Sequence, residues 1–211
     1  MIPELEKLRP QEIERRSFEL IEQELARPLD PALAPVIRRV IHTTADFDYA
    51  DTLYFSRDAV PVALELLRGG ATIVTDTHMA EAGINKVALK KLGCQVACFM
   101  SDADVAAAAE RDGTTRATAA VDKAAALPGR VIFAVGNAPT ALIRICERMD
   151  EGTLTPAFII GVPVGFVNVV PAKELVLQSG APCIVARGRK GGSNVAAAIV
   201  NALMYLLTRE N

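Results

Sequence analysis

Six short, largely apolar runs, each separated from the next by a stretch with helical periodicity, constrain the fold of this chain more than any other feature. A strand with one solvated face alternates apolar and polar residues, whereas these runs are almost continuously apolar. The runs are Leu53–Ser56, Ala71–Thr75, Gln95–Met100, Arg130–Val135, Ala157–Val162 and Cys183–Ala186. Because such strands are buried on both faces, they predict a mainly parallel, doubly wound sheet between two layers of helices, a three-layer α/β/α fold.

Helical periodicity marks the segments between and around these runs. The predicted helices are Pro10–Ala26, Ala32–Thr43, Asp58–Leu67, Met79–Lys91 (a pattern that also allows a break), Asp102–Arg111, Thr115–Ala126, Thr140–Met149, Ala172–Gln178 and Asn194–Leu207. The first two form an N-terminal helical segment before the first strand. Since the chain has 211 residues and shows neither a linker nor an internal repeat, we expect one domain, residues 1–211.

Composition argues against several classes of protein. The formal net charge of −2 leaves no global positive field, so nucleic acid is not an expected partner. No run of about 18 uninterrupted apolar residues occurs, so a membrane span is not expected either. The N-terminal sequence is charged and lacks the apolar stretch of a signal peptide, which favours a cytoplasmic location.

The four cysteines do not have the spacing of a metal site. They are Cys94, Cys98, Cys146 and Cys183. No Cys-x-x-Cys pair occurs, and the chain has only two histidines to act as further ligands. Cys94 and Cys98 share one face of a predicted strand, and Cys183 begins another. We therefore expect small buried thiols in a reducing compartment, with no metal site and no cofactor.

His42 is the candidate site residue whose direction follows from helical spacing. In a helix over Ala32–Thr43, the core-facing stripe consists of Leu33, Val36, Ile37, Val40 and Ile41. Arg38, Arg39 and His42 project from the opposite side, where both arginines are helical neighbours of the imidazole. Because histidine titrates near neutral pH, this face predicts a place that holds an anionic molecule and transfers a proton to it.

The segment Arg187–Ser193 predicts an anion-binding loop between a strand and a helix. Its three glycines permit close backbone approach, and Ser193 is placed to cap the following helix. Arg187, Arg189 and Lys190 would act with the helix amides, although a solvated basic turn has the same pattern. The loop is not a phosphate-binding P-loop, and no Gly-x-Gly-x-x-Gly opens a first strand–helix unit, so a dinucleotide cofactor is not expected.

Two pairs of residues on other predicted helices are candidates for ligand contact. Arg116, next to Thr115, lies in a first turn, where a cation opposes the helix dipole unless a carboxylate binds. A surface arginine that points away is the alternative. Ser17, beside Arg16, lies in the apolar stripe of the first helix, where it serves either close packing or a hydrogen bond to a ligand. That stripe consists of Ile13, Leu20 and Ile21.

Two predicted strand ends carry further turn motifs. Asp76-Thr-His78 partly matches the Asp-x-His-x-x-Gly motif of corrinoid-binding domains, whose histidine ligates cobalt. Glu81 stands where that motif needs glycine. We therefore expect His78 to be a polar residue in the first turn of a helix, not a cobalt ligand. Gly136–Pro139 predicts a strand-to-helix turn with Asn137 as the cap.

Six segments together resemble the precorrin-8X methylmutase family, which includes the cobalt-precorrin-8 methylmutases of vitamin B12 synthesis. The segments are Arg16-Ser-Phe18, Arg39-Val-Ile-His42, Thr115-Arg116, Gly136–Leu142, Pro163–Val167 and Arg187–Ser193. They occur in family order from near the start to near the end, so the resemblance covers essentially the whole chain. One departure is Pro171-Ala172-Lys173, where the family commonly reads Glu-Ser-Lys, so the role of that acidic residue is in question.

The resemblance implies an isomerase without a cofactor. Such an enzyme moves a methyl group from C11 to C12 of a large tetrapyrrole and yields hydrogenobyrinate or cobyrinate. The matching positions imply that His42 donates and accepts the proton, and that Ser17 and Arg39 contact the substrate. Thr115 and Arg116 are implied as further contacts. The family resemblance also implies a homodimer with active sites near the subunit interface.

The chemistry of such a substrate fits the basic side chains of this chain. The macrocycle carries many carboxylate arms, and arginine pairs with a carboxylate through two parallel hydrogen bonds. The residues expected to bind these arms or to lie beside them are Arg16, Arg39, Arg116, Arg187, Arg189 and Ser193. A protonated imidazole can donate its proton to a ring nitrogen and lower the barrier to a 1,5-sigmatropic methyl shift.

Two other functions stay open at this point. A corrinoid-binding carrier on the same scaffold would hold the ring without isomerising it, although binding alone needs no proton donor such as His42. A nucleotide-dependent enzyme of the same fold class would need the glycine fingerprint that this chain lacks. The sequence also does not tell whether the substrate already contains cobalt.

Overall fold

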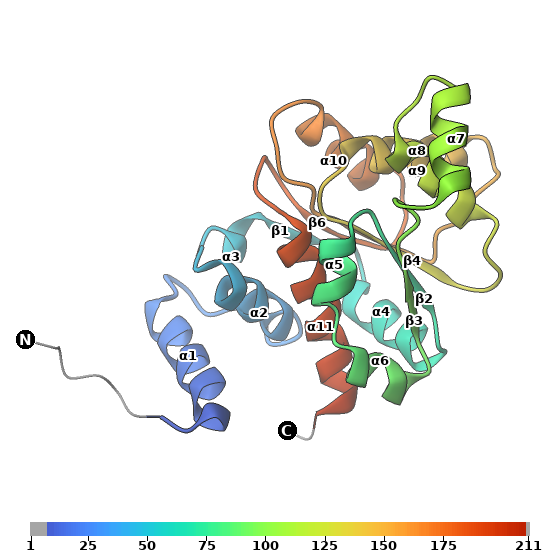
Figure 1. The fold of residues 1–211 in the computed structure, drawn as a ribbon. Coiled ribbons are helices and arrows are strands. Elements are labelled where there is room, and N and C mark those ends of the chain that lie inside the picture. Colours follow the sequence, from blue (N-terminus) through green and yellow to red (C-terminus); the bar gives the residue numbers. More distant parts are fainter. Residues whose placement is uncertain (1–7, 210–211) are drawn as a thin grey trace, which may run out of the picture.

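The computed structural model describes residues 8–209, and within them one six-stranded sheet forms the centre of the molecule (Figure 1). Its strands are β1 (Leu53–Phe55), β2 (Thr72–Thr75), β3 (Gln95–Ala97), β4 (Val131–Val135), β5 (Phe158–Gly161) and β6 (Cys183–Ala186). Their order is β1-β6-β5-β4-β2-β3, and every neighbouring pair is parallel except β1 with β6. The predicted mainly parallel sheet is therefore confirmed.

The central strands β4, β5 and β6 are buried along their whole length. Ile132 of β4 lies opposite Phe158 of β5 in the parallel register. Ile132 and Ala134 enter the apolar core on one face of the sheet. Phe133 and Val135 enter the core on the other face. Because both faces are covered, no position of these strands is left for a solvated side chain, which explains the continuous apolar runs.

Helices cover the sheet on both sides (Figure 1). On one side lie α2 (Ala34–Thr44), α4 (Ala59–Arg68), α5 (His78–Gly83), α6 (Lys86–Leu92) and α11 (Ser193–Thr208). On the other side lie α8 (Arg116–Ala125), α9 (Pro139–Asp150) and α10 (Val169–Gln178), with α7 (Ala103–Arg111) packed against α8. A short α3 (Tyr49–Thr52), which the sequence pattern did not predict, precedes β1. The break that the pattern of residues 79–91 allowed is present, between α5 and α6.

The helix α11 is the centre of its layer. Most of its 16 residues are buried and apolar, because α2, α4, α5 and α6 all pack around it. A membrane-spanning helix needs roughly 20 apolar residues, so α11 is too short for that role. Within residues 8–209, no helix combines the length and the apolar character that crossing a membrane requires.

The helix α1 (Pro10–Glu24) lies on the outside of α2, away from the sheet (Figure 1). Of its predicted core stripe, Ile21 is buried, but Ile13 and Leu20 are 51% and 39% exposed. The prediction that this stripe faces a core is therefore wrong for two of its three residues. The physical reason is that α1 packs mainly on one other helix, which cannot cover a full face.

The carboxyl ends of β2, β4, β5 and β6 lie along one edge of the sheet because these strands are parallel. The connections that follow them are residues 76–77, 136–138, 162–168 and 187–192. The helix α11 also begins at this edge. In open α/β sheets, ligands bind beyond the carboxyl ends of the strands, so the fold directs attention to these connections.

Candidate functional site

The end of α2 brings His42 to the carboxyl edge of the sheet. Thr43, near the end of α2, and Asn194, at the start of α11, line the same hollow. Pro35, at the start of α2, and Arg209, just after α11, line the adjoining one. The two helices therefore run in opposite directions, and His42 lies beside the start of α11. Its side chain is exposed, as the helical spacing predicted.

The imidazole of His42 is held by an aromatic contact and not by a hydrogen bond. The ring of Phe18 lies edge-on to it, with the ring centres 5.5 Å apart and the planes at 69°. Within the part of the chain that the structure describes, neither imidazole nitrogen has a hydrogen-bond partner. The contact with Phe18 therefore restrains the ring and leaves both nitrogens available to a ligand.

Arg39 is fixed from three sides, one helical turn before the end of α2. Its guanidinium lies 4.9 Å from the ring centre of Phe18 and 5.1 Å from that of Tyr205. It also forms an ion pair with Glu14 of α1. Arg209 binds the other carboxylate oxygen of Glu14 at 2.6 Å. Stacking and pairing together hold the planar guanidinium in one orientation.

The carboxylate of Glu14 shows how an anion binds beside Arg39. Burial opposes its ionisation, but Arg39 and Arg209 outweigh that effect and hold the pKa of Glu14 below its ordinary value. A carboxylate is thus stable as an anion beside Arg39. No local sequence pattern marks Glu14, Tyr205 and Arg209 as site residues, since 25 residues separate Glu14 from Arg39 and 195 separate it from Arg209.

Two adjoining hollows form a groove along α2 and α11, with Arg39 and Tyr205 in the wall of both. Their volumes are about 290 and 270 Å³. The remaining lining residues of the first are Phe18, Pro35, Arg38, Ala202, Leu206 and Arg209. Those of the second are Thr43, Gly83, Asn194, Ala197, Ala198 and Asn201. A groove with apolar walls and a few fixed cations suits a large, partly apolar anion.

The basic loop 187–192 is anchored by its backbone. Lys173 of α10 is fully buried, and its Nζ donates to the carbonyl oxygens of Gly188 and Lys190, both at 2.8 Å. Burial lowers the pKa of Lys173 to about 8. In the sequence, Lys173 stands out only as part of a family motif, because a lysine in a helix is usually exposed. Its position in the apolar layer of α10 was the available signal.

The three cations of this loop are used differently. The ammonium group of Lys190 lies 2.6 Å from carboxylate oxygens of both Asp46 and Asp48, which follow α2. This pairing lowers the pKa of Asp46 and ties the loop to the end of α2. Lys190 thus pairs with carboxylates of the same chain, and its expected contact with a bound anion stays a prediction. Arg187 and Arg189 are exposed, so their N–H edges face solvent.

Each of the two exposed arginines rests on an aromatic ring. Arg187 lies 4.8 Å from the ring centre of Tyr54, and Arg189 lies 5.3 Å from that of Phe166. Such contacts favour an orientation for the guanidinium but leave its hydrogen-bond donors free. Both residues therefore stay candidates for contact with a carboxylate.

Ser193 does not cap α11, contrary to the sequence prediction. Gly192 occupies the cap position, and Ser193 is the first residue of the helix. The Ser193 hydroxyl instead lies 2.7 Å from the Thr77 hydroxyl, at the start of α5. The start of α11 also packs against Gly136, where a Cβ atom would come within 2.7 Å of the Ser193 Cα. Ser193 is therefore a nearly buried residue at which the connections after β2, β4 and β6 come together.

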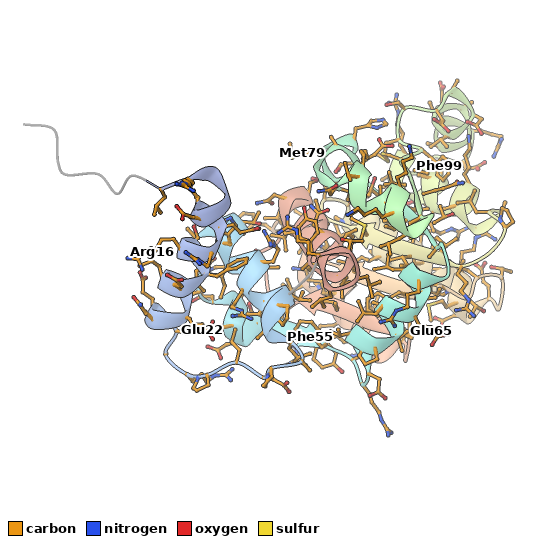
Figure 2. All side chains as sticks on the ribbon, turned by 90° about the horizontal axis from the view of Figure 1, so that it is seen from below. Arg16, Glu22, Phe55, Glu65, Met79 and Phe99 are labelled. Atoms are coloured by element: carbon orange, nitrogen blue, oxygen red, sulfur yellow. The ribbon has the colours of Figure 1, made fainter. Side chains whose placement is uncertain are left out.

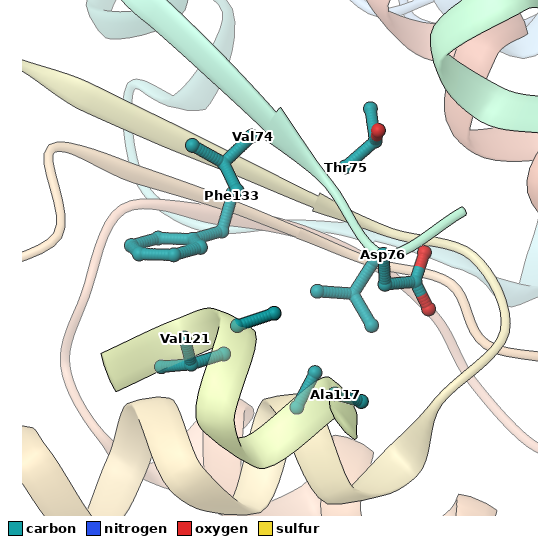
Figure 3. Close-up of a pocket in the computed structure, with 9 residues that line it drawn as sticks. Val74, Thr75, Asp76, Ala117, Val121 and Phe133 are labelled. Atoms are coloured by element: carbon teal, nitrogen blue, oxygen red, sulfur yellow. The ribbon is translucent and has the colours of Figure 1, made fainter. Parts of the chain in front are cut away.

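Asp76 takes the capping role that the sequence suggested for Asn137. Its buried carboxylate accepts hydrogen bonds from the amides of Gly136, Asn137 and Ala138, at 2.8, 2.8 and 2.6 Å. Figure 3 shows this carboxylate at the end of β2, beside the connection that follows β4. Burial raises the pKa of Asp76, and the three amides oppose the rise. Asp76 thus holds the turn before α9, whose cap residue is Ala138.

Thr115 and Arg116 lie in the opposite layer of helices from His42. The Thr115 hydroxyl caps α8 by accepting from the Thr118 amide at 3.1 Å, and it also lies 2.9 Å from the Thr140 hydroxyl. Arg116 is exposed, and within residues 8–209 it has no hydrogen-bond or ion-pair partner. The fold of one chain therefore does not bring this pair into contact with His42.

Ser17 and Arg16 lie on the outer helix α1. The Ser17 hydroxyl donates to the carbonyl oxygen of Ile13 at 2.9 Å, a local bond that a ligand would have to replace. Arg16 is 3.6 Å from a carboxylate oxygen of Glu19, and Figure 2 labels it on α1. Both residues are close in sequence to Phe18, which contacts His42. The candidate residues on α1 are therefore near the proton-donor end of α2.

Comparisons with known proteins give one consistent result. The family model described as precorrin-8X methylmutase matches residues 12–206 of this chain. A cobalt-precorrin-8 methylmutase from Salmonella typhimurium is 47% identical over 208 residues, covering 94% of this chain and 96% of that protein. A precorrin-8X methylmutase from Pseudomonas aeruginosa is 40% identical over 197 residues, covering 92% and 94%. The crystal structure of precorrin-8x methyl mutase from Thermus thermophilus has a TM-score of 0.84 at 39% identity, covering 92% and 96%.

Proposed function

Because this chain belongs to the precorrin-8X methylmutase family, and is thus a methylmutase, an isomerase, we propose that it moves a methyl group from C11 to C12 of precorrin-8X or cobalt-precorrin-8. The product would be hydrogenobyrinate or cobyrinate. The single observation that carries the assignment of roles is the end of α2. There, neither ring nitrogen of His42 has a hydrogen-bond partner among residues 8–209, and one turn earlier Arg39 is held in a fixed orientation. A proton donor thus lies one helical turn from a carboxylate anchor that lines the groove, and both side chains contact Phe18.

In the proposed mechanism, His42 acts as a general acid. The protonated imidazole donates its proton to a nitrogen of the conjugated ring, which draws electron density from the ring system. The bond from C11 to the methyl carbon then breaks as the bond from C12 to the same carbon forms. Since the product is an isomer of the substrate, the proton must return before the next turnover, and His42 is available to accept it.

Arginine side chains supply the proposed recognition of the carboxylate arms. Arg39 already binds a carboxylate, that of Glu14, so a substrate arm can take the same place by displacing it. Arg16 of α1 and the loop residues Arg187 and Arg189 would bind further arms. No cofactor is part of this proposal, since acid catalysis and fixed positive charges are sufficient for it.

We propose a homodimer as the working unit. The connection after β5 exposes three apolar side chains, Val164, Phe166 and Val167, at 48%, 82% and 77%. An exposed apolar group of this kind marks an interaction surface. In a dimer, Thr115 and Arg116 of a second copy can approach a site near the subunit interface. Sedimentation analysis tests the dimer, and a monomer at micromolar concentration would contradict it.

The decisive test is conversion of the substrate by a purified His42→Ala variant. We expect this variant to bind the tetrapyrrole but to convert it at least about 100-fold more slowly, because it lacks the acid. Absorbance spectra report the conversion, and calorimetric titration with the product reports binding. Full turnover by His42→Ala would remove His42 from the mechanism.

The same assay addresses the alternative of a non-catalytic corrinoid carrier. A carrier would bind the ring without changing its absorbance spectrum, even in the unmodified protein. A groove that holds only an anion does not need an imidazole with both nitrogens free, so we favour the isomerase. Absence of conversion by the unmodified protein with either substrate would favour the carrier.

A further inference from the structure

The side chains of His78, Glu81 and Cys98 converge at the carboxyl ends of β2 and β3. His78 and Glu81 belong to α5, and Cys98 follows β3. One potential ligand atom from each of the three lies within 4.8 Å of the other two. We propose that these three side chains bind one Zn²⁺ ion. Imidazole nitrogen, carboxylate oxygen and cysteine sulfur are the donors that zinc uses in proteins.

Ser101 gives His78 the outer partner that a zinc-bound histidine usually has. The Nδ1 atom of His78 lies 2.8 Å from a carboxylate oxygen of Glu81, and Nε2 lies 2.7 Å from the Ser101 hydroxyl. Since a hydroxyl both donates and accepts, Ser101 can accept the Nε2 proton. Nδ1 is then free to bind the metal beside Glu81. Such an outer hydrogen bond fixes the tautomer and the orientation of a ligating ring.

Cys98 brings a buried sulfur to the same point. Burial raises the pKa of its thiol, so zinc binding would release a proton. The thiolate and the Glu81 carboxylate together would neutralise the charge of the ion. His78 is exposed and Glu81 partly so, which leaves an entry path and a fourth position for water.

The ion would cross-link two segments of the chain beside the proposed substrate groove. One is the start of α5, and the other is the connection after β3; Met79 and Phe99 mark them in Figure 2. The residue before His78, Thr77, is hydrogen-bonded to Ser193 at the start of α11. The ion would thus stabilise the carboxyl edge of the sheet at a place separate from His42. This proposal does not depend on the methylmutase assignment.

The test is a titration of the chelator-treated full-length protein with Zn²⁺ by calorimetry, in the presence of a competing chelator. We expect one ion per chain and a higher melting temperature with zinc. With Co²⁺ as the probe, we expect a thiolate-to-cobalt charge-transfer band in the near ultraviolet. Cys98→Ser should abolish the band, and His78→Ala should weaken zinc binding by at least about tenfold.

Two further variants keep the test independent of folding defects. Glu81→Gln changes a partly exposed side chain and should also weaken binding. Cys146→Ser, at a buried thiol in the opposite core, should leave binding and the cobalt band unchanged. Two results would overturn the proposal: no binding at micromolar Zn²⁺, or binding that the Cys98, His78 and Glu81 variants leave intact.

Discussion

Arg39 lines the proposed substrate groove, whereas Arg187 and Arg189 lie on the basic loop 187–192, and the protein holds these two sets of arginines by different means. Arg39 is fixed as a side chain, between the rings of Phe18 and Tyr205 and against Glu14. Only 14% of its side chain is exposed. A charge held in this way needs little rearrangement to receive a carboxylate, so it can contribute strongly to affinity.

Arg187 and Arg189 are held through their backbone instead. Their side chains are exposed, but the loop that carries them is fixed by two contacts. Lys173 donates hydrogen bonds to its backbone, and Lys190 pairs with Asp46. This arrangement fixes the position of the loop, while each exposed guanidinium is oriented only by its contact with one aromatic ring. We therefore expect a clamped charge and an anchored loop to respond differently to mutation, pH and salt.

The largest expected effect concerns the anchor of the loop and its pH dependence. The pKa of Lys173 is about 8 in the fold, against an ordinary value of 10.5. Between these values the unfolded chain binds a proton that the folded chain does not, so this group makes stability rise with pH. The measured quantity is the free energy of unfolding of the unmodified protein minus that of Lys173→Met. This difference should rise by up to about 3 kcal/mol between pH 8 and pH 10.5.

Urea unfolding of both proteins across this pH range measures the difference. Other groups titrate in both proteins, so their contributions cancel when the two curves are subtracted. A constant difference over the whole range would show that Lys173 is not a buried titrating group.

The next effect concerns the clamped charge. Arg39→Ala should weaken product binding by about 10- to 100-fold, because a charge-assisted pair contributes about 1.5–3 kcal/mol. The fold should change little, since Glu14 keeps its bond to Arg209. Calorimetric titration with the product measures the loss. Arg15→Ala, at an exposed arginine of α1 paired with Glu19, is the matched control and should bind normally.

A smaller effect on binding is expected when the loop anchor is removed at neutral pH. In Lys173→Met, the carbonyl groups of Gly188 and Lys190 lose their donor, so the loop should shift and product affinity should fall by about tenfold. Stability should change less, because the variant also removes a buried charge whose desolvation is unfavourable. Lys91→Met, at an exposed lysine, is the control. Unchanged affinity in Lys173→Met would mean that the loop does not contribute to binding.

The smallest effect is expected for a single exposed arginine. Arg189→Ala should weaken product binding by less than about fivefold, since exposed ion pairs contribute about 1 kcal/mol or less. The loss should shrink further as salt is added, because salt screens exposed charges. Titrations at low and high salt measure both. A loss as large as that of Arg39→Ala would erase the distinction between the clamped charge and the anchored loop.

The residues that cap α9 and α11 could not be predicted from the sequence. Asn137 and Ser193 have the residue types of caps, and both predictions are wrong. The carboxylate that holds the turn before α9 belongs to Asp76, which is 60 residues from Gly136. A cap supplied from another strand leaves no local pattern, so only the neighbouring strand ends β2 and β4 reveal it.

Local periodicity, by contrast, predicted most of the architecture. The strands and the stripe of α2 follow from which positions are apolar, because burial on a strand or a helix repeats with a fixed spacing. The stripe of α1 failed for the same reason: periodicity tells which side is apolar but not whether anything covers it.

The sequence by itself determined the mainly parallel sheet, the exposed direction of His42 and, through ordered motifs, the family to which the chain belongs. Only the tertiary structure decided that Glu14 forms an ion pair with Arg39 and that Lys173 anchors the basic loop. It also decided that the side chains of His78, Glu81 and Cys98 lie close together. The first group depends on local spacing, which any stretch of sequence displays. The second depends on which strand ends become neighbours, and the packing of the whole sheet decides that.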